Sequence, residues 1–281
     1  MTRNKTIGLT VLAMFAFASN SLLCRLALKH TAVDPASFTA IRIVSGAIAL
    51  WLLVRLRSRA SAVTGHWLSA CALFAYAIAF SWAYISLSAA TGALLLFGAV
   101  QATMIGYGRW RGERLRPRQL LGFLAALFGL CSLLLPGLTA PPLAGAALML
   151  GAGVAWGIYS LRGKTSGAAL ETTAGNFIRA VPLALLASAI ALPWMSIDMQ
   201  GVAYAIASGA LASGIGYAIW YAALPSLTAS AAATVQLSVP LITAFGGVIL
   251  LSEALTVRLL LASIAILGGI ALVVLDRAKS K

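Results

Sequence analysis

Long apolar runs occupy most of this 281-residue chain and leave little polar sequence between them. Hydrophobic residues make up 61% of the chain and charged residues only 9%, whereas soluble domains hold about 45–50% and about 25%. A helix that crosses a bilayer needs about 20 mostly apolar residues. Such runs lie near residues 7–28, 35–56, 66–88, 90–108, 119–135, 143–162, 171–192, 201–222, 228–251 and 257–275. The sequence therefore predicts an all-α integral membrane protein with ten transmembrane helices and no soluble domain.

The basic residues predict the orientation of these spans. If the chain alternates across the membrane, the side that holds the N-terminus collects 15 of the 20 lysines and arginines. The other side receives Lys29 and Arg258, and Arg25, Arg42 and Arg179 fall inside spans. Because cytoplasmic loops are enriched in Lys and Arg, we expect a multi-pass protein of the cell inner membrane with both termini in the cytoplasm. The net charge of +14 then reflects topology, and no nucleic-acid partner is predicted.

The second half of the chain repeats the first at an offset of about 140 residues. Residues 113–135 match 253–275 at this offset, which pairs Glu113 with Glu253. One pair of arginines matches at a slightly smaller offset: Arg42 with Arg179. Coincident apolar letters mean little in such a composition, whereas coincident Glu and Arg residues indicate a true internal repeat.

The two halves are expected to have opposite orientations in the membrane. Residues 1–141 form the first five-helix repeat and residues 142–281 the second, and an odd number of spans inverts the second half. The loop around Glu113 carries five arginines, whereas the loop around Glu253 carries only Arg258. Inverted repeats are typical of secondary transporters, whose substrate site lies near the midplane between the halves.

The N-terminus also allows a second interpretation. Arg3 and Lys5, followed by an apolar stretch that ends at 16–18, have the form of a cleavable signal peptide. Cleavage there would delete part of the helix that the repeat pairs with the segment around Trp156. We therefore expect the first span to be retained.

Two inverted halves of five spans, with a glutamate shortly before the last span of each, resemble the drug/metabolite transporter superfamily and its EamA-type members. The resemblance covers about residues 7–275, and its motifs are the segment from Trp156-Gly157 to Lys164, Arg42 and Arg179, and Ser252-Glu253. The aromatic-rich spans are most similar to YddG-type exporters of aromatic amino acids. The chain departs from the family pattern at Phe17-Ala18, where Trp-Gly is common, and at Val100, where the second half has Pro240.

The residue types that enzymes need are missing from the predicted spans. The sequence has no HExxH or GxSxG motif, and both histidines, His30 and His66, lie at predicted span ends. No acidic residue lies near a span centre, and the three cysteines are far apart without CxxC spacing. We therefore predict no enzymatic activity, no cofactor and no metal.

Amide and aromatic side chains inside the spans are the candidate substrate-binding residues. A buried amide in a membrane must face protein or a water-filled cavity. Tyr76, Phe80 and Tyr84 are spaced so that they share one helix face, and Trp156 lies deeper than interfacial tryptophans do. Ordinary helix packing is the competing explanation for each. The candidates are Asn20, Tyr76, Phe80, Tyr84, Phe97, Gln101, Trp156, Tyr159, Tyr217 and Gln236.

Five further residues are predicted to serve gating or structure. Arg42 and Arg179 are expected to pair with carbonyls, and a role in binding a substrate carboxylate is the alternative. Glu113 and Glu253 are expected to cap and position equivalent loops. Pro240 is expected to kink the ninth span, because proline removes a helical hydrogen bond.

The sequence thus predicts an alternating-access transporter for small neutral apolar or aromatic amino acids and related metabolites, and the family resemblance implies export. Aromatic walls would bind the side chain, while amides and exposed backbone would compensate the desolvated ammonium and carboxylate. Efflux of lipophilic cations is one alternative, although such cations usually require a buried carboxylate. A non-transporting or lipid-handling membrane protein is the other. The expected partners are a small-molecule substrate and the lipid bilayer.

Overall fold

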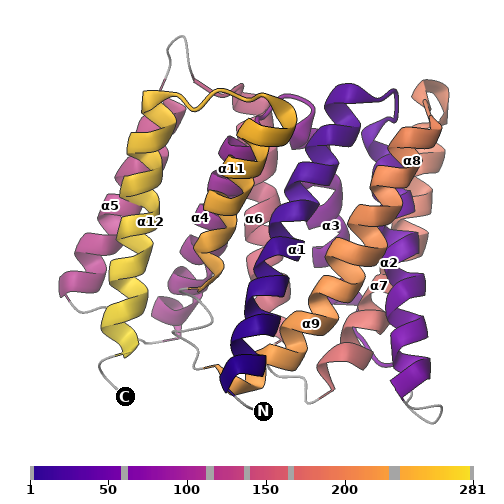
Figure 1. The fold of residues 1–281 in the computed structure, drawn as a ribbon, viewed down its shortest axis with the longest axis horizontal. Coiled ribbons are helices and arrows are strands. Elements are labelled where there is room, and N and C mark those ends of the chain that lie inside the picture. The colour runs from indigo at the N-terminus through magenta and orange to yellow at the C-terminus, as the bar shows by residue number, and fades with distance from the viewer. Residues whose placement is uncertain are drawn as a thin grey trace.

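The computed structural model describes residues 3–57, 63–111, 117–135, 140–163, 168–227 and 235–278, and their regular structure is helical. In chain order the elements are α1 (Arg3–His30), α2 (Pro35–Arg57), α3 (Trp67–Tyr84), α4 (Ala89–Trp110), α5 (Pro117–Leu134), α6 (Leu143–Gly163), α7 (Ala169–Ile190), η1 (Leu192–Trp194), α8 (Met199–Ile206), η2 (Ala207–Ile215), α9 (Gly216–Ala223), η3 (Leu224–Ser226), α11 (Ser238–Leu251) and α12 (Val257–Ala278). The start of α1 and the end of α12 lie at the same, lower end of the bundle (Figure 1). The predicted all-α class is confirmed.

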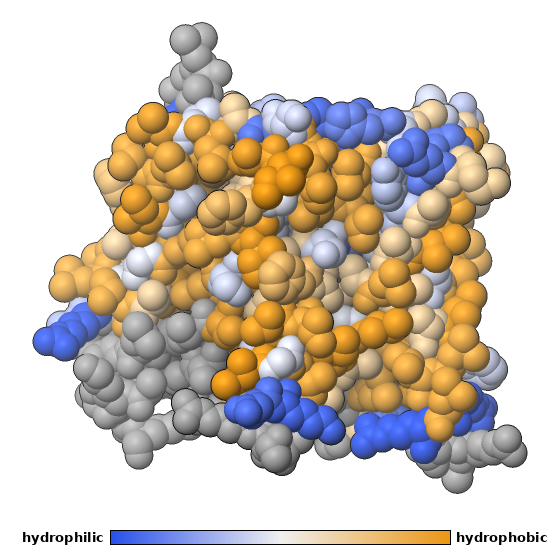
Figure 2. Space-filling view, in the orientation of Figure 1, coloured by the Kyte–Doolittle hydropathy of each residue, from blue (hydrophilic) through white to orange (hydrophobic). Residues whose placement is uncertain are grey.

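Helix length and surface composition fit a lipid environment. Within the described ranges, seven helical segments are long and apolar enough to cross a membrane, and three shorter apolar segments cover Leu120–Leu133, Ser238–Leu251 and Val257–Leu272. A broad apolar band crosses the face in Figure 2, and hydrophilic residues gather along its lower and upper edges. Large apolar side chains such as Phe245 and Ile249 are more than 70% exposed. Because contiguous apolar surface of this extent is unfavourable in water, it belongs in the hydrocarbon of a bilayer.

A central bundle and a peripheral helix pair make up the packing. In the central bundle α2 packs on α7 and η2, α3 packs on α6, and α4 also packs on α6. The pair α5 and α12 lies side by side at one edge of the molecule and reaches the bundle through α4 (Figure 1). A Cβ atom added at Gly129 would lie 2.8 Å from the Cβ of Ala265, and one added at Gly269 would overlap the backbone oxygen of Gly122. Small residues therefore allow these two helices to approach closely.

The segments α8, η2 and α9 form one long helix with a π-helical stretch at its centre. This stretch covers Ala207–Ile215, and such turns are frequent at functional sites. A side chain at Gly209 would collide with the backbone oxygen of Arg42. The contact between η2 and α2 is therefore a close approach of two backbones, and it places the serines of η2 in the core of the bundle.

The ninth predicted span, for which the sequence predicts a kink at Pro240, is interrupted one turn before that residue. Helix α11 begins at Ser238, directly after a turn residue at Leu237. Pro240 thus lies in the first turn of a helix, where its missing N–H removes no helical hydrogen bond. The expected single helix over 228–251 is interrupted at Leu237, and residues 228–234 lie outside the described part of the chain.

Candidate functional site

Four segments meet at a buried polar cluster in the middle of the bundle. The amide nitrogen of Asn20 on α1 donates to the Tyr76 hydroxyl on α3 at 3.0 Å, and Arg42 Nη2 on α2 donates to the same hydroxyl at 2.8 Å. Ser208 on η2 donates to Asn20 Oδ1 at 2.6 Å. A longer contact of 3.5 Å joins Arg42 Nε to the Ser213 hydroxyl. The cluster therefore ties the first half of the chain to the π-helical stretch of the second.

Arg42 is a buried cation that the surrounding protein compensates only in part. Its side chain is 3% exposed, and the guanidinium carbon lies 5.1 Å from the Tyr76 ring centre and 5.0 Å from that of Phe80. A cation–π contact that is shielded from water contributes about 2 kcal/mol. Within the described part of the chain, Nη1 has no hydrogen-bond partner, and no carboxylate pairs with Arg42. The site therefore carries a positive charge without a counter-ion.

Aromatic rings form a continuous wall beside this cluster. The ring centre of Trp156 on α6 lies 4.8 Å from that of Tyr76, 5.2 Å from that of Tyr217 on α9, and 5.3 Å from that of Tyr159, on which it stacks. Phe17 on α1 meets Tyr217 edge-on at 5.8 Å. Such pairs are favourable by about 0.5–1.5 kcal/mol beyond the area they bury. They also hold the large flat faces in place around one space.

That space is a cavity with both polar and aromatic lining. Its unfilled volume, including its opening to the surroundings, is about 370 Å³. It is lined by Phe17, Asn20, Ser21, Tyr76, Phe80, Leu96, Phe97, Trp156, Ala212, Ser213 and Tyr217. The lining residues come from both halves of the chain and include no charged side chain. The chemistry of this lining matches that of a small molecule with an apolar body and polar groups at one end.

An ion pair joins α1 to the segment between α11 and α12, which lies at the upper end of the bundle (Figure 1). Arg25 on α1 contacts Glu253, which follows α11, with Nε 3.1 Å from Oε1, and both side chains are largely buried. Arg25 Nη1 also donates to the backbone oxygens of Tyr84 at 2.7 Å and Ile85 at 3.0 Å. The other carboxylate oxygen of Glu253 accepts from the backbone N–H of Ala89 at 2.8 Å, at the first residue of α4. Three polypeptide segments that are distant in sequence are thus joined above the cavity.

Arg179, which the repeat pairs with Arg42, has a different environment. Its Nη1 donates to the backbone oxygens of Thr64 and Gly175, both at 3.0 Å. Thr64 belongs to the segment between α2 and α3, at the opposite end of the bundle from Glu253. Arg179 therefore donates to carbonyl groups near that end of the bundle and does not join the central cluster.

Six of the ten candidate substrate-binding residues line the cavity. They are Asn20, Tyr76, Phe80, Phe97, Trp156 and Tyr217. Tyr84 and Tyr159 lie one layer behind, because Tyr84 meets Phe80 edge-on at 4.7 Å and Tyr159 stacks on Trp156.

The remaining candidates lie elsewhere. Gln101 is buried in α4, and Gln236 directly precedes the turn before α11; neither lines the cavity. Of the residues expected to gate or support the fold, Glu253 caps the start of α4, while Glu113 lies outside the described residues.

Sequence reasoning missed Ser208, Ser213 and Arg25 in this region, and it also missed four other lining residues: Phe17, Ser21, Leu96 and Ala212. Ser208 and Ser213 carry no signal, because serines in membrane spans usually bond to their own helix. Arg25 does carry one, since an arginine inside an apolar run must find a partner. Its partner, Glu253, lies 228 residues away and is brought to it only by the fold.

Comparisons with known proteins match the chain along nearly its full length. The model of the EamA-like transporter family matches residues 4–135 and again residues 143–275. An uncharacterized protein of Pseudomonas aeruginosa is 56% identical over 278 residues, which cover 99% of this chain and 97% of that protein. A crystal structure superposes with a TM-score of 0.68 at 19% identity, covering 98% of this chain and 99% of the other, and shows the same fold.

A further relative has a named transport activity. The threonine/homoserine exporter RhtA of Escherichia coli K12 is 35% identical over 162 residues, and the match covers 55% of this chain and 54% of that exporter. The match thus spans about half the length of each protein. Because the family model covers both halves of the chain and the apolar helices suit a bilayer, the chain belongs to the EamA-like transporter family and is a multi-pass membrane transporter, not an enzyme.

Proposed function

We propose that this transporter exports small neutral apolar or aromatic amino acids and related metabolites across the cell inner membrane. The observation that carries the proposal is the mixed lining of the central cavity. Trp156, Tyr217 and Phe80 offer flat apolar faces for a side chain, while Asn20 and Tyr76 offer uncharged polar groups for the charged end of the substrate. A zwitterion needs polar partners of this kind to replace the water it loses.

The relatives support the substrate class without defining the substrate. RhtA is named for threonine and homoserine, two small polar amino acids. The three rings around Trp156, at 4.8–5.3 Å, form a larger apolar wall than such side chains use. We therefore favour larger apolar or aromatic side chains, as in YddG-type exporters.

Alternating access is the mechanism that fits the arrangement. We infer that ten spans form two inverted repeats, residues 1–141 and 142–281, with both termini in the cytoplasm. Two observations support this topology. The family model matches the chain twice, and the start of α1 and the end of α12 lie at the same end of the bundle (Figure 1). With this orientation the Arg25–Glu253 pair closes the periplasmic side. Its separation would open the cavity outward.

Efflux of lipophilic cations is less compatible with the site. Arg42 stands beside the cavity with a full positive charge, and no described lining residue carries a carboxylate. A cation in this low-dielectric space would be repelled. A zwitterion has a negative group that the same charge attracts.

The substrate proposal is tested by counterflow in liposomes that contain the purified protein. Labelled phenylalanine, tryptophan and leucine are each offered to vesicles preloaded with the same unlabelled compound, without pH or sodium gradients. We expect protein-dependent accumulation of these compounds, and none of ethidium, a lipophilic cation. Accumulation of ethidium alone would replace the proposal with multidrug efflux.

Topology is tested separately with single cysteines at positions 113 and 253 in a background without native cysteines. An impermeant thiol reagent is expected to label them from opposite sides of the membrane. Labelling of both from one side would contradict the inverted repeat. That result would not change the interpretation of the counterflow assay.

A further inference from the structure

The hydrogen bonds around Tyr76 leave hydrogen-bond donors available at the cavity wall. The Tyr76 oxygen accepts two hydrogen bonds, from Asn20 at 3.0 Å and from Arg42 at 2.8 Å. Both of its lone pairs are then used, and its own O–H hydrogen remains to donate. Asn20 Oδ1 accepts from Ser208 at 2.6 Å, and the amide nitrogen of Asn20 keeps a second hydrogen that it can donate. Because Tyr76 and Asn20 both line the cavity, the polar part of the wall offers hydrogens to an acceptor.

A positive charge stands directly behind this wall. Arg42 touches the wall residues Tyr76, Phe80 and Ser213, and its Nη1 has no partner within the described ranges. The ion pair that the described residues do contain joins Arg25 and Glu253 at the upper end. A buried cation without a counter-ion is unfavourable in a low-dielectric interior. An incoming anion would remove this imbalance.

We propose that the substrate's carboxylate binds here, against the Tyr76 hydroxyl and the Asn20 amide, with Arg42 balancing its charge from behind. This inference rests on the proposed function and narrows its substrate class to molecules with a free carboxylate. Tyr76 and Asn20 contact the substrate, and Arg42 is a positioning residue that acts through Tyr76. The apolar part of the substrate then lies along Trp156, whose ring is 4.8 Å from that of Tyr76.

Arg179 supplies a matched control for Arg42. The repeat pairs the two arginines, and both lie inside predicted spans. Arg179 Nη1 already donates to two backbone oxygens at 3.0 Å, so it has no comparable excess of donors at a cavity. Removing its charge tests what the loss of an intramembrane arginine does in general.

The experiment compares a carboxylic acid with its amide as competitors. Counterflow of labelled phenylalanine into proteoliposomes is inhibited by unlabelled phenylalanine or by phenylalaninamide, which lacks the negative charge. In the wild type we expect the amide to compete about tenfold more weakly or worse, as for a lost charged hydrogen bond. In Arg42→Gln we expect phenylalanine to compete more weakly and phenylalaninamide to compete as before, so that their inhibition strengths differ by no more than about twofold. Arg42→Lys and Arg179→Gln are expected to keep the preference for the acid.

Several outcomes would overturn the proposal. Equal competition by acid and amide in the wild type would exclude a carboxylate site, and equal weakening of both by Arg42→Gln would make Arg42 a structural residue. Should Arg42→Gln not fold, Tyr76→Phe gives the same test, because it keeps the ring against Trp156 and removes the hydroxyl. We expect this variant to lose the acid preference as well, and its retention would contradict the site.

A second readout separates this proposal from the proposed function. Thermal unfolding of the purified protein is measured with 3-phenylpropionate or with 3-phenylpropanamide, neither of which is an amino acid. Bound ligand stabilises the folded state by mass action, and we expect only the acid to raise the Tm, in the wild type but not in Arg42→Gln. If the acid raises the Tm in this way while no amino acid is transported, the proposed substrate class is wrong, but the proposed carboxylate site is supported. If neither compound raises the Tm and no amino acid is transported, both proposals fail.

Discussion

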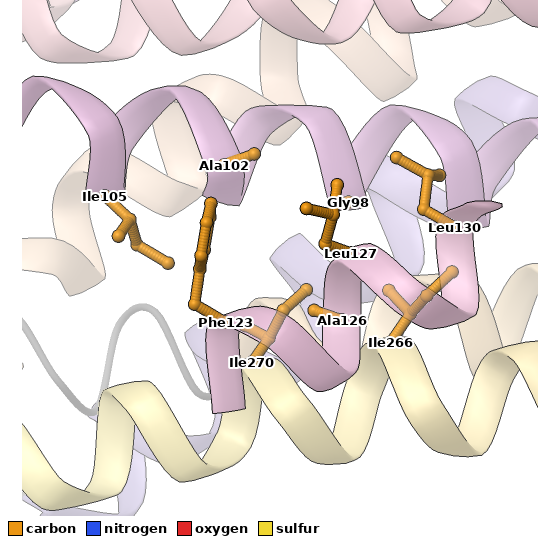
Figure 3. A pocket seen from close by; sticks show the side chains of 9 residues that line it. All are labelled: Gly98, Ala102, Ile105, Phe123, Ala126, Leu127, Leu130, Ile266 and Ile270. Atoms are coloured by element: carbon orange, nitrogen blue, oxygen red, sulfur yellow. The ribbon is translucent and has the colours of Figure 1, made fainter. Parts of the chain in front are cut away.

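Among the described residues, a central cavity and a second hollow at the bundle edge differ in chemistry. The central cavity has an unfilled volume of about 370 Å³ and the second hollow, between α4, α5 and α12, about 410 Å³. Side chains of the second hollow point inward from three helices and are all apolar (Figure 3). They are Gly98, Ala102, Ile105, Phe123, Ala126, Leu127, Leu130, Ile266 and Ile270.

The difference shows why volume alone does not indicate a transport site. An ammonium or carboxylate that entered the apolar hollow would lose its water and gain no hydrogen bond, which is strongly unfavourable. The central cavity offers the Asn20 and Tyr76 donors beside a guanidinium. We therefore propose that transport uses the central cavity and that the apolar hollow serves packing at the bundle edge.

The largest expected effect is on phenylalanine transport, when one aromatic residue is truncated in each hollow. Trp156→Ala is expected to lower phenylalanine transport about tenfold or more, because contacts with three rings and the buried area are lost. Phe123→Ala, in the apolar hollow, is expected to change transport less than about twofold. Both variants are compared in proteoliposomes at equal amounts of folded protein. Equal losses would remove the distinction between the hollows.

A second test asks whether the helix pair α5 and α12 at the bundle edge contributes to stability and not to transport. Gly269→Ala places a methyl group against the backbone oxygen of Gly122, whereas a Cβ at the neighbouring Gly268 meets nothing within 4 Å. Overpacking of this kind costs about 1–3 kcal/mol. We expect a lower Tm for Gly269→Ala, an unchanged Tm for Gly268→Ala, and wild-type transport per folded molecule for both. Thermal unfolding in detergent and counterflow provide the two measurements.

A smaller effect concerns access, because only the central cavity needs a gate. Glu253→Gln weakens the contact with Arg25, and single cysteines at Ser213 and Ala126 report entry of a thiol reagent from the upper end. We expect labelling at position 213 to rise about fivefold, because a charged hydrogen bond between largely buried groups becomes a neutral one, a difference of about 1 kcal/mol. Labelling at position 126 should not change.

Arg258 provides the control for that access experiment. It lies at the same end and donates to the backbone oxygens of Ser132 and Leu135, which joins α12 to α5. Arg258→Gln therefore loosens the edge pair without touching the Arg25–Glu253 contact. Faster labelling at position 213 in this variant would show general loosening in place of a gate.

Some features of the fold and of the central cavity can be predicted from the sequence, and others cannot. Runs of apolar residues with basic ends leave few structures other than membrane helices, so the class and most helix positions followed from the sequence. Regular spacing likewise placed Tyr76 and Phe80 on one face. The π-helical stretch that carries Ser208 and Ser213 follows no residue pattern, because local packing against α2 decides it.

The smallest expected effect lies in the loops above the central cavity. Asp198 accepts hydrogen bonds from the backbone N–H groups of Gly201 and Ala32, both at 2.8 Å, and so caps α8 and ties it to the segment after α1. The Gly201 N–H is the main cause that holds the pKa of this carboxyl below its ordinary value of 3.8. A carboxyl with a lowered pKa stabilises the fold above the unfolded-state value and loses that contribution as the pH falls further.

Asp198→Asn should therefore lower the Tm slightly at pH 7, and the difference from the wild type should shrink below pH 3.8. The effect is small because Asp198 is partly exposed and water screens its charge. Thermal unfolding in detergent across this pH range checks both parts. A Tm difference that stays constant between pH 7 and pH 3 would show that the charge of Asp198 does not contribute. The cap would then act only through the neutral hydrogen bonds that asparagine also accepts.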